Sequence, residues 1–137
     1  MTLQAVLLEE PMAGSKKTIL FVEDDKPIAE MYSRILEREG YHVEFAYNGR
    51  DGLEKAQSKH YDLVLLDIMM PEKTGIEVLH ELRGEDGQGH PDTKIVILTN
   101  LAQDKTSQEA LKSQADGYII KADIVPSQLA GIVGKLI

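Results

Sequence analysis

The chain has 137 residues, which fits a single domain, and its formal net charge of −8 argues against direct nucleic-acid binding, because phosphate backbones select basic surfaces. It has no cysteine, which excludes disulfides and thiolate metal sites, and its four histidines show no ligand spacing. No apolar run approaches the roughly 20 residues of a membrane span, and no basic start precedes the first apolar stretch, so we expect a cytoplasmic protein without membrane contact.

Residues 1–16 differ in pattern from the rest of the chain. A short helix could form from Leu3, Val6, Leu7 and Leu8, but Pro11 and the residues that follow it interrupt any such helix. We expect residues 1–16 to be a flexible leader and residues 17–137 to form one domain. The alternative is a leader that docks on this domain or on a second copy.

From Lys17 onward, predicted strands alternate with predicted helices. The strands are expected at residues 18–22, 42–46, 63–67, 94–99 and 117–120. The continuous apolar runs in the first and third are typical of strands buried on both faces of a parallel sheet. Five such units with right-handed crossovers predict an α/β fold, a doubly wound five-stranded parallel sheet with helices on both faces.

The helices are predicted from apolar residues at helical spacing. The first has the stripe Ile28, Met31, Tyr32, Ile35 and Leu36, with Pro27 in its first turn and Gly40 at its end. The second helix covers about 49–59. The third begins near Gly75, with Ile76, Leu79 and Leu82 facing inward. The polar fourth covers about 105–115, and the last carries the stripe Leu129, Ile132, Val133 and Leu136. The glycine-rich stretch 84–89 precedes a strand, so we interpret it as a loop and not as a phosphate cradle.

Acidic side chains follow two of the predicted strands. Glu23, Asp24 and Asp25 come directly after the first strand, and Asp67 ends the third. Ligands of open α/β sheets bind outside the carboxyl ends of the strands, so these carboxylates are expected to converge. Carboxylates packed together repel, and Mg²⁺ is the natural counter-ion for an all-oxygen site, which indicates phosphoryl chemistry. The alternative is that this acidic run caps the first helix, and Asp25 is expected to do only that.

Two further polar residues stand at strand ends, Thr99 at the end of the fourth strand and Lys121 after the fifth. Together with the acidic residues, with the run Asp67-Ile68-Met69-Met70-Pro71 and with Gly75, they make residues 17–137 resemble the receiver domain of two-component response regulators. The resemblance implies the flavodoxin-like strand order 2-1-3-4-5. It also implies a signalling domain, which catalyses only its own phosphorylation and dephosphorylation.

The resemblance assigns the acidic residues to phosphorylation and to Mg²⁺. Asp67 would be the carboxylate that accepts the phosphoryl group, from a sensor histidine kinase or a phosphotransfer protein. Asp24, Asp67 and the backbone carbonyl of Met69 would bind Mg²⁺, and Glu23 would help through water.

The remaining site residues would stabilise and report the phosphoryl group. Lys121 would pair with it or with Asp67, and Thr99 would offer it a hydroxyl. Tyr118 matches the aromatic switch position, so phosphorylation would change the surface of the fourth helix, fifth strand and fifth helix that an unknown target protein reads.

Two positions depart from the family pattern. Ala122 follows Lys121 where proline is usual, and we lean towards a cis peptide there despite its cost of roughly 3–4 kcal/mol. Asn100 replaces a small residue and could narrow access to the phosphoryl group. Met69 and Leu101 are apolar at positions that tune dephosphorylation, which predicts a long-lived phosphoryl-aspartate.

Other interpretations stay open. The domain could be a stand-alone regulator, which we favour, or a fragment of a longer one. It could be a degenerate receiver that binds protein without phosphorylation. Two enzyme or carrier classes fit poorly: an aspartate-nucleophile phosphatase needs an aspartate where Met69 stands, and a flavodoxin-type carrier would have its flavin phosphate repelled by Glu23 to Asp25.

Overall fold

The structure is a computed structural model, and it describes residues 16–99, 115–121 and 125–137. The predictions for most of the leader, for the fourth helix, and for Asn100, Leu101 and the Lys121–Ala122 peptide fall outside these residues. Within the described part of the chain, no helix is long and apolar enough to cross a membrane.

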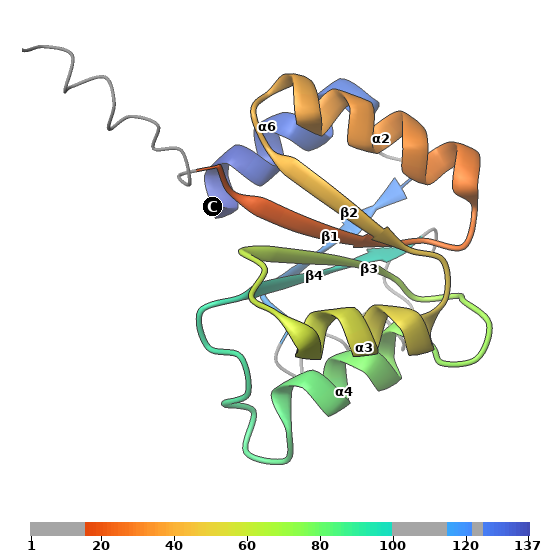
Figure 1. Cartoon of the computed structure of the whole chain (residues 1–137), viewed down its shortest axis with the longest axis vertical. Helices are drawn as coiled ribbons and strands as arrows, with labels where there is room; N and C mark the ends of the chain where they lie inside the picture. Colours follow the sequence, from red (N-terminus) through yellow and green to blue (C-terminus); the bar gives the residue numbers. More distant parts are fainter. Residues whose placement is uncertain (1–15, 100–114, 122–124) are drawn as a thin grey trace, which may run out of the picture.

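The centre of the fold is a parallel five-stranded sheet (Figure 1). Its strands are β1 (Thr18–Val22), β2 (His42–Ala46), β3 (Leu63–Asp67), β4 (Lys94–Thr99) and β5 (Gly117–Ile120). Their order is β2-β1-β3-β4-β5, and all four pairings are parallel. The predicted strand bounds and the predicted order are both confirmed.

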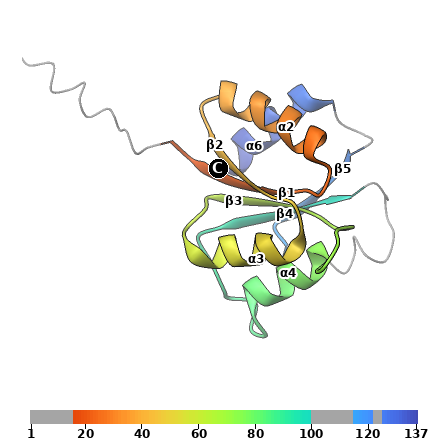
Figure 2. The ribbon, with the colours of Figure 1, turned by 45° about the vertical axis from the view of Figure 1, so that its right-hand side comes forward.

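Helices cover both faces of the sheet. On one face lie α2 (Lys26–Arg38) and α6 (Pro126–Leu136), and on the other lie α3 (Gly49–Ser58) and α4 (Gly75–Arg83), as both ribbon views show (Figure 1, Figure 2). Each face has its own buried cluster, and successive residues of β1 alternate between them: Leu20 and Val22 pack on the α3 and α4 side, Ile19 and Phe21 on the other. This explains why the first and third strands have no polar face in the sequence.

The ends of α2 follow the sequence closely, but its buried stripe does not. The side chain of Asp25 caps the helix by accepting a hydrogen bond from the Ile28 N–H at 3.1 Å, and Gly40 takes the left-handed φ of 98° that ends it. Met31 was predicted to be inside and is 41% exposed, so that prediction is wrong. It lies five residues before the buried Leu36, and about 100° per residue carries it well round the helix from that stripe.

Candidate functional site

Four neighbouring strands bring polar side chains to one edge of the sheet. Glu23 directly follows β1, Asp67 is the last residue of β3, Thr99 is the last of β4, and Lys121 directly follows β5. Because the strands are parallel, their carboxyl ends share this edge. Residues separated by almost the whole domain in sequence are therefore neighbours in space.

Lys121 connects two of the carboxylates. Its Nζ donates a hydrogen bond to Oε1 of Glu23 at 2.7 Å and lies 3.3 Å from Oδ2 of Asp67. All three side chains are largely withdrawn from solvent, with 14% of Lys121, 2% of Glu23 and 9% of Asp67 exposed. Ion pairs gain more strength in such a setting than at an open surface, because little water screens them.

The carboxylates themselves form a close group. One oxygen from each of Glu23, Asp24 and Asp67 lies within 4.8 Å of the others. The Glu23 side chain is buried and accepts a hydrogen bond from the Asp25 N–H at 3.3 Å, whereas Asp24 is exposed to solvent. Two of these oxygen donors are buried and the third, from Asp24, is exposed. Such a set fits a hard divalent cation that keeps some water ligands, as Mg²⁺ prefers.

The pKa values of the site reflect this crowding. Burial raises the pKa of Glu23. The hydrogen bond from Lys121 lowers this pKa, and the neighbouring Asp67 carboxylate raises it. Burial and the neighbouring Glu23 also raise the pKa of Asp24. Burial alone would lower the pKa of Lys121, but Glu23 and Asp67 outweigh it, so the pKa of the ammonium is raised and it stays charged. Negative charge thus exceeds positive charge in this group of four side chains, which favours a bound cation.

The other predicted site residues lie around this group. Thr99 is buried at the end of β4 and pairs with Ile120 of β5. Tyr118 lies on β5 and is 36% exposed, and the Met69 side chain is 74% exposed on the loop after β3. These positions are compatible with the roles assigned from sequence, which themselves stay predictions.

Two glycines hold the loop that follows Asp67. The Gly75 N–H donates to the Ile68 carbonyl at 3.0 Å, and a Cβ at Gly75 would come within 2.4 Å of the Asp67 carbonyl oxygen. At the start of α3, a Cβ at Gly49 would come within 1.7 Å of the Lys73 carbonyl oxygen. The backbone around the predicted acceptor is therefore packed too closely for a side chain at either position.

The sequence did not reveal the Glu23–Lys121 hydrogen bond. We expected Lys121 to contact Asp67 or a phosphoryl group, and Glu23 to act only near the metal. The one signal for this contact was that both residues directly follow strands, β1 and β5, which β3 and β4 separate in the sheet.

Comparison with known proteins agrees with this geometry. Residues 19–132 match the family described as response regulator receiver domain. The response regulator ArlR of Staphylococcus saprophyticus is 38% identical over 118 residues, which cover 86% of this chain and 51% of ArlR. The transcriptional regulatory protein DltR of Streptococcus agalactiae is 42% identical over 103 residues, or 75% of this chain and 44% of DltR. The chain thus spans about half the length of these curated relatives.

Solved structures show the same fold. The chemotaxis response regulator CheY4 of Vibrio cholerae superposes with a TM-score of 0.80 at 30% identity, covering 90% of this chain and 100% of that one. The response regulator TrrA of Thermotoga maritima, solved in complex with Mg²⁺ and BeF, superposes with a TM-score of 0.75 at 36% identity, covering 88% and 99%.

Proposed function

The chain belongs to the response regulator receiver domain family, and from this premise we propose that it accepts a phosphoryl group on Asp67 from a sensor histidine kinase or a phosphotransfer protein. The observation that carries the proposal is the Lys121 ammonium, which lies 3.3 Å from the Asp67 carboxylate and 2.7 Å from that of Glu23. A buried carboxylate beside a fixed ammonium suits attack on phosphorus and stabilisation of the charge that develops.

The transfer step follows from these positions. A carboxylate oxygen of Asp67 forms a bond to phosphorus while the bond from phosphorus to the donor's histidine nitrogen breaks. The nitrogen leaves with the bonding electron pair, and Asp67 becomes an acyl phosphate. During transfer, negative charge is spread over the three equatorial phosphoryl oxygens, so the contribution of Lys121 is electrostatic and positional.

We propose Mg²⁺ as the cofactor. Asp24, Asp67 and the Met69 carbonyl would hold it, with Glu23 acting through water. When bound, Mg²⁺ would neutralise the acidic group and the phosphoryl oxygens. Support comes from the oxygen-only donor set with raised pKa values at Glu23 and Asp24, and from TrrA, whose structure was solved with Mg²⁺ and BeF.

Signal output is proposed to run through Thr99 and Tyr118. The Thr99 hydroxyl would move to the phosphoryl oxygens, and Tyr118, which is now partly exposed on β5, would turn inward. The population of an active conformation would rise. A target protein would recognise the surface of the predicted fourth helix (residues about 105–115), β5 and α6. With its charge of −8, the domain itself would not bind DNA, even if a longer regulator contained it.

A degenerate, phosphorylation-independent receiver is the alternative, and phosphorylation from a small-molecule donor separates the two. The protein is incubated with Mg²⁺ and acetyl phosphate, and its intact mass is measured. The proposal predicts a gain of one phosphoryl group that requires Mg²⁺ and disappears in Asp67→Asn. Asp25→Asn, which changes the helix cap beside the site, is the matched control and should still be phosphorylated. No gain in the parent protein would favour the degenerate binding module.

A further inference from the structure

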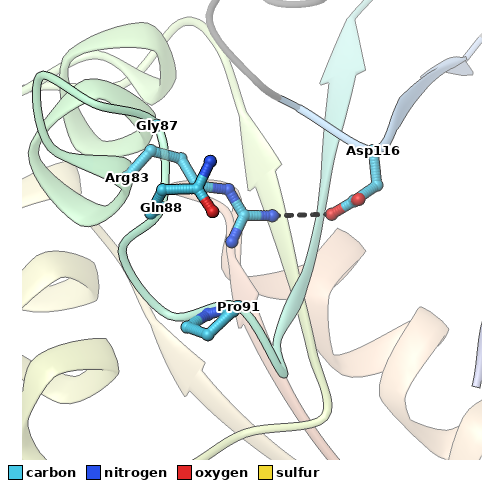
Figure 3. A pocket seen from close by; sticks show the side chains of 5 residues that line it. All are labelled: Arg83, Gly87, Gln88, Pro91 and Asp116. Atoms are coloured by element: carbon cyan, nitrogen blue, oxygen red, sulfur yellow. Dashed lines mark hydrogen bonds and ion pairs between the residues drawn. The ribbon is translucent and has the colours of Figure 1, made fainter.

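Arg83 is a buried arginine whose hydrogen-bonding groups are directed into the protein. It is the last residue of α4, and 7% of its side chain is exposed. One Nη donates to the carbonyl oxygens of Gly89 and His90 at 3.0 and 2.8 Å. The other donates to the Thr93 carbonyl at 3.1 Å. It also donates to Oδ2 of Asp116 at 2.7 Å (Figure 3).

A pocket of about 210 Å³ opens beside this guanidinium, and Gly87, Gln88 and Pro91 complete its lining (Figure 3). Each Nη carries two hydrogens and makes two hydrogen bonds, so neither offers a further donor to a ligand. The Arg83–Asp116 pair therefore acts within the chain. The four bonds named above join the end of α4, the connection to β4 and the residue that precedes β5.

Asp116 is also bound to the backbone of β4. Its Oδ2 accepts a hydrogen bond from the Ile95 N–H at 2.7 Å, and its own N–H donates to the Ile95 carbonyl at 2.8 Å. The next residue, Gly117, pairs with Val96 and begins the β4–β5 ladder. Asp116 is therefore anchored to β4 one residue before the ladder begins, where it can fix the register in which β5 joins the sheet.

The register of β5 in turn determines where Lys121 lies, since Lys121 directly follows the four-residue strand. A slip by one residue would shift the strand by about 3.3 Å and reverse its faces, exchanging the buried Ile119 with the exposed Tyr118. The contacts of Lys121 with Glu23 and Asp67, at 2.7 and 3.3 Å, would not survive such a shift.

We propose that Arg83 is a positioning residue for Lys121: through Asp116 it fixes the register of β5, and thereby sets the ammonium against Glu23 and Asp67 at the opposite end of the strand. This inference rests on the proposed function in so far as Lys121 serves phosphoryl transfer. Arg83 itself touches none of the reacting groups.

The test replaces the guanidinium fork without removing its charge. Arg83→Lys keeps one positive charge but cannot reproduce four bonds in a plane, and Asp116→Asn is the milder variant on the other side of the pair. Arg34→Lys, on the exposed side of α2, is the matched control. We expect phosphoryl transfer from acetyl phosphate to slow by roughly 10- to 100-fold in Arg83→Lys, with Mg²⁺ bound at least as tightly as in the parent. An unchanged transfer rate would overturn the proposal.

A double-mutant cycle distinguishes positioning from general damage. Lys121→Met is introduced into the parent and into Arg83→Lys, and the loss of transfer rate is compared. If Arg83 acts through Lys121, the loss is several-fold smaller in the Arg83→Lys background, where the ammonium is already misplaced. An equal loss in both backgrounds would overturn the inference.

Amide hydrogen exchange tests the structural step independently of phosphorylation. The proposal predicts faster exchange of the β5 amides in Arg83→Lys and Asp116→Asn, with β1 amides unchanged. Parent-like protection of β5 in both variants would contradict the proposal, and if Arg83→Lys does not fold, Asp116→Asn decides. A parent protein that accepts no phosphoryl group would defeat the proposed function, whereas the exchange measurement would still decide whether Arg83 holds β5.

Discussion

Lys121 donates to Glu23 at 2.7 Å, across 98 positions of sequence, and this contact is shorter than the 3.3 Å between Lys121 and Asp67. The ammonium therefore lies between the buried Glu23 carboxylate and the predicted phospho-acceptor, Asp67. A divalent cation bound by the same carboxylates would share their charge with Lys121. We therefore expect Mg²⁺ and the Lys121 ammonium to compete for these carboxylates.

The first prediction concerns Lys121→Met. Loss of the ammonium leaves Glu23 and Asp67 buried without their partner, so the protein in EDTA should lose about 3–5 kcal/mol of unfolding free energy. Mg²⁺ should bind more tightly than in the parent, because less positive charge repels it. Chemical denaturation with and without Mg²⁺ measures both effects.

The exposed Lys135→Met on α6 is the control for this change and should leave stability and Mg²⁺ affinity unaltered. Weaker Mg²⁺ binding in Lys121→Met would mean that the lysine organises the carboxylates instead of opposing the metal.

The lifetime of the phosphoryl group gives a second prediction. Met69 is 74% exposed on the loop after Asp67, and its apolar side chain cannot orient an attacking water. We expect phosphorylated protein to persist beyond seconds, and Met69→Asn to release phosphate several-fold faster because its amide can hold that water. A phosphate-release time course decides, with the exposed Met31→Asn as control. Loss within seconds in the parent protein would refute this prediction.

The third prediction is a pH dependence at the edge strand β2. The hydrogen bond from the Lys59 ammonium holds the pKa of Glu44 below its usual value; burial opposes this, and the Tyr61 hydroxyl, at 2.8 Å, adds to it. A depressed carboxylate pKa contributes stability that is fully present above the unfolded value of 4.5 and is lost as pH falls through the folded value. Denaturation between pH 3 and 6 should therefore show stability falling below about pH 4.5.

In Glu44→Gln, the part of the stability loss at low pH that comes from Glu44 should be missing. Stability should therefore fall less steeply with falling pH than in the parent. Glu54→Gln is the matched control, because its 3.7 Å pair with Arg50 is two-thirds exposed and should contribute little. Identical pH curves for Glu44→Gln and the parent would show that the Glu44 contacts do not contribute to stability.

Two glycines give a fourth prediction with opposite signs. Gly49→Ala would place a Cβ 1.7 Å from the Lys73 carbonyl oxygen and should destabilise the protein by more than about 2 kcal/mol. Gly131→Ala lies within α6, where no atom of the described residues comes within 4 Å of the added Cβ, and should stabilise by about 0.5–1 kcal/mol through helix propensity. Thermal unfolding of both variants measures the difference, and a neutral Gly49→Ala would mean that the loop after Asp67 yields easily.

Much of the fold was predictable because its signals are local. All five strands were located from the sequence, β1 and β3 by continuous apolar runs bounded by polar residues, and Asp25, Pro27 and Gly40 marked the ends of α2. Met31 was misplaced because a run of apolar residues at mixed three- and four-residue steps leaves the centre of the buried stripe ambiguous.

The candidate site was predictable as a set of strand ends, but not as a set of bonds. Sequence gives the edge at which Glu23 and Lys121 arrive, whereas their hydrogen bond depends on side-chain reach across β3 and β4. Arg83 was missed for a similar reason: its partner Asp116 lies 33 positions away, and only the packed sheet turns an ordinary last-turn arginine into a buried one.

The most direct test of the account locates the phosphoryl group chemically. Protein treated with acetyl phosphate and Mg²⁺ is reduced with borohydride, which converts an acyl phosphate of aspartate to homoserine, and its peptides are then analysed by mass spectrometry. If Asp67 accepts the phosphoryl group, homoserine appears at position 67, dependent on Mg²⁺ and absent in protein treated with EDTA. Unmodified Asp67, or homoserine at Asp24 in its place, would contradict it.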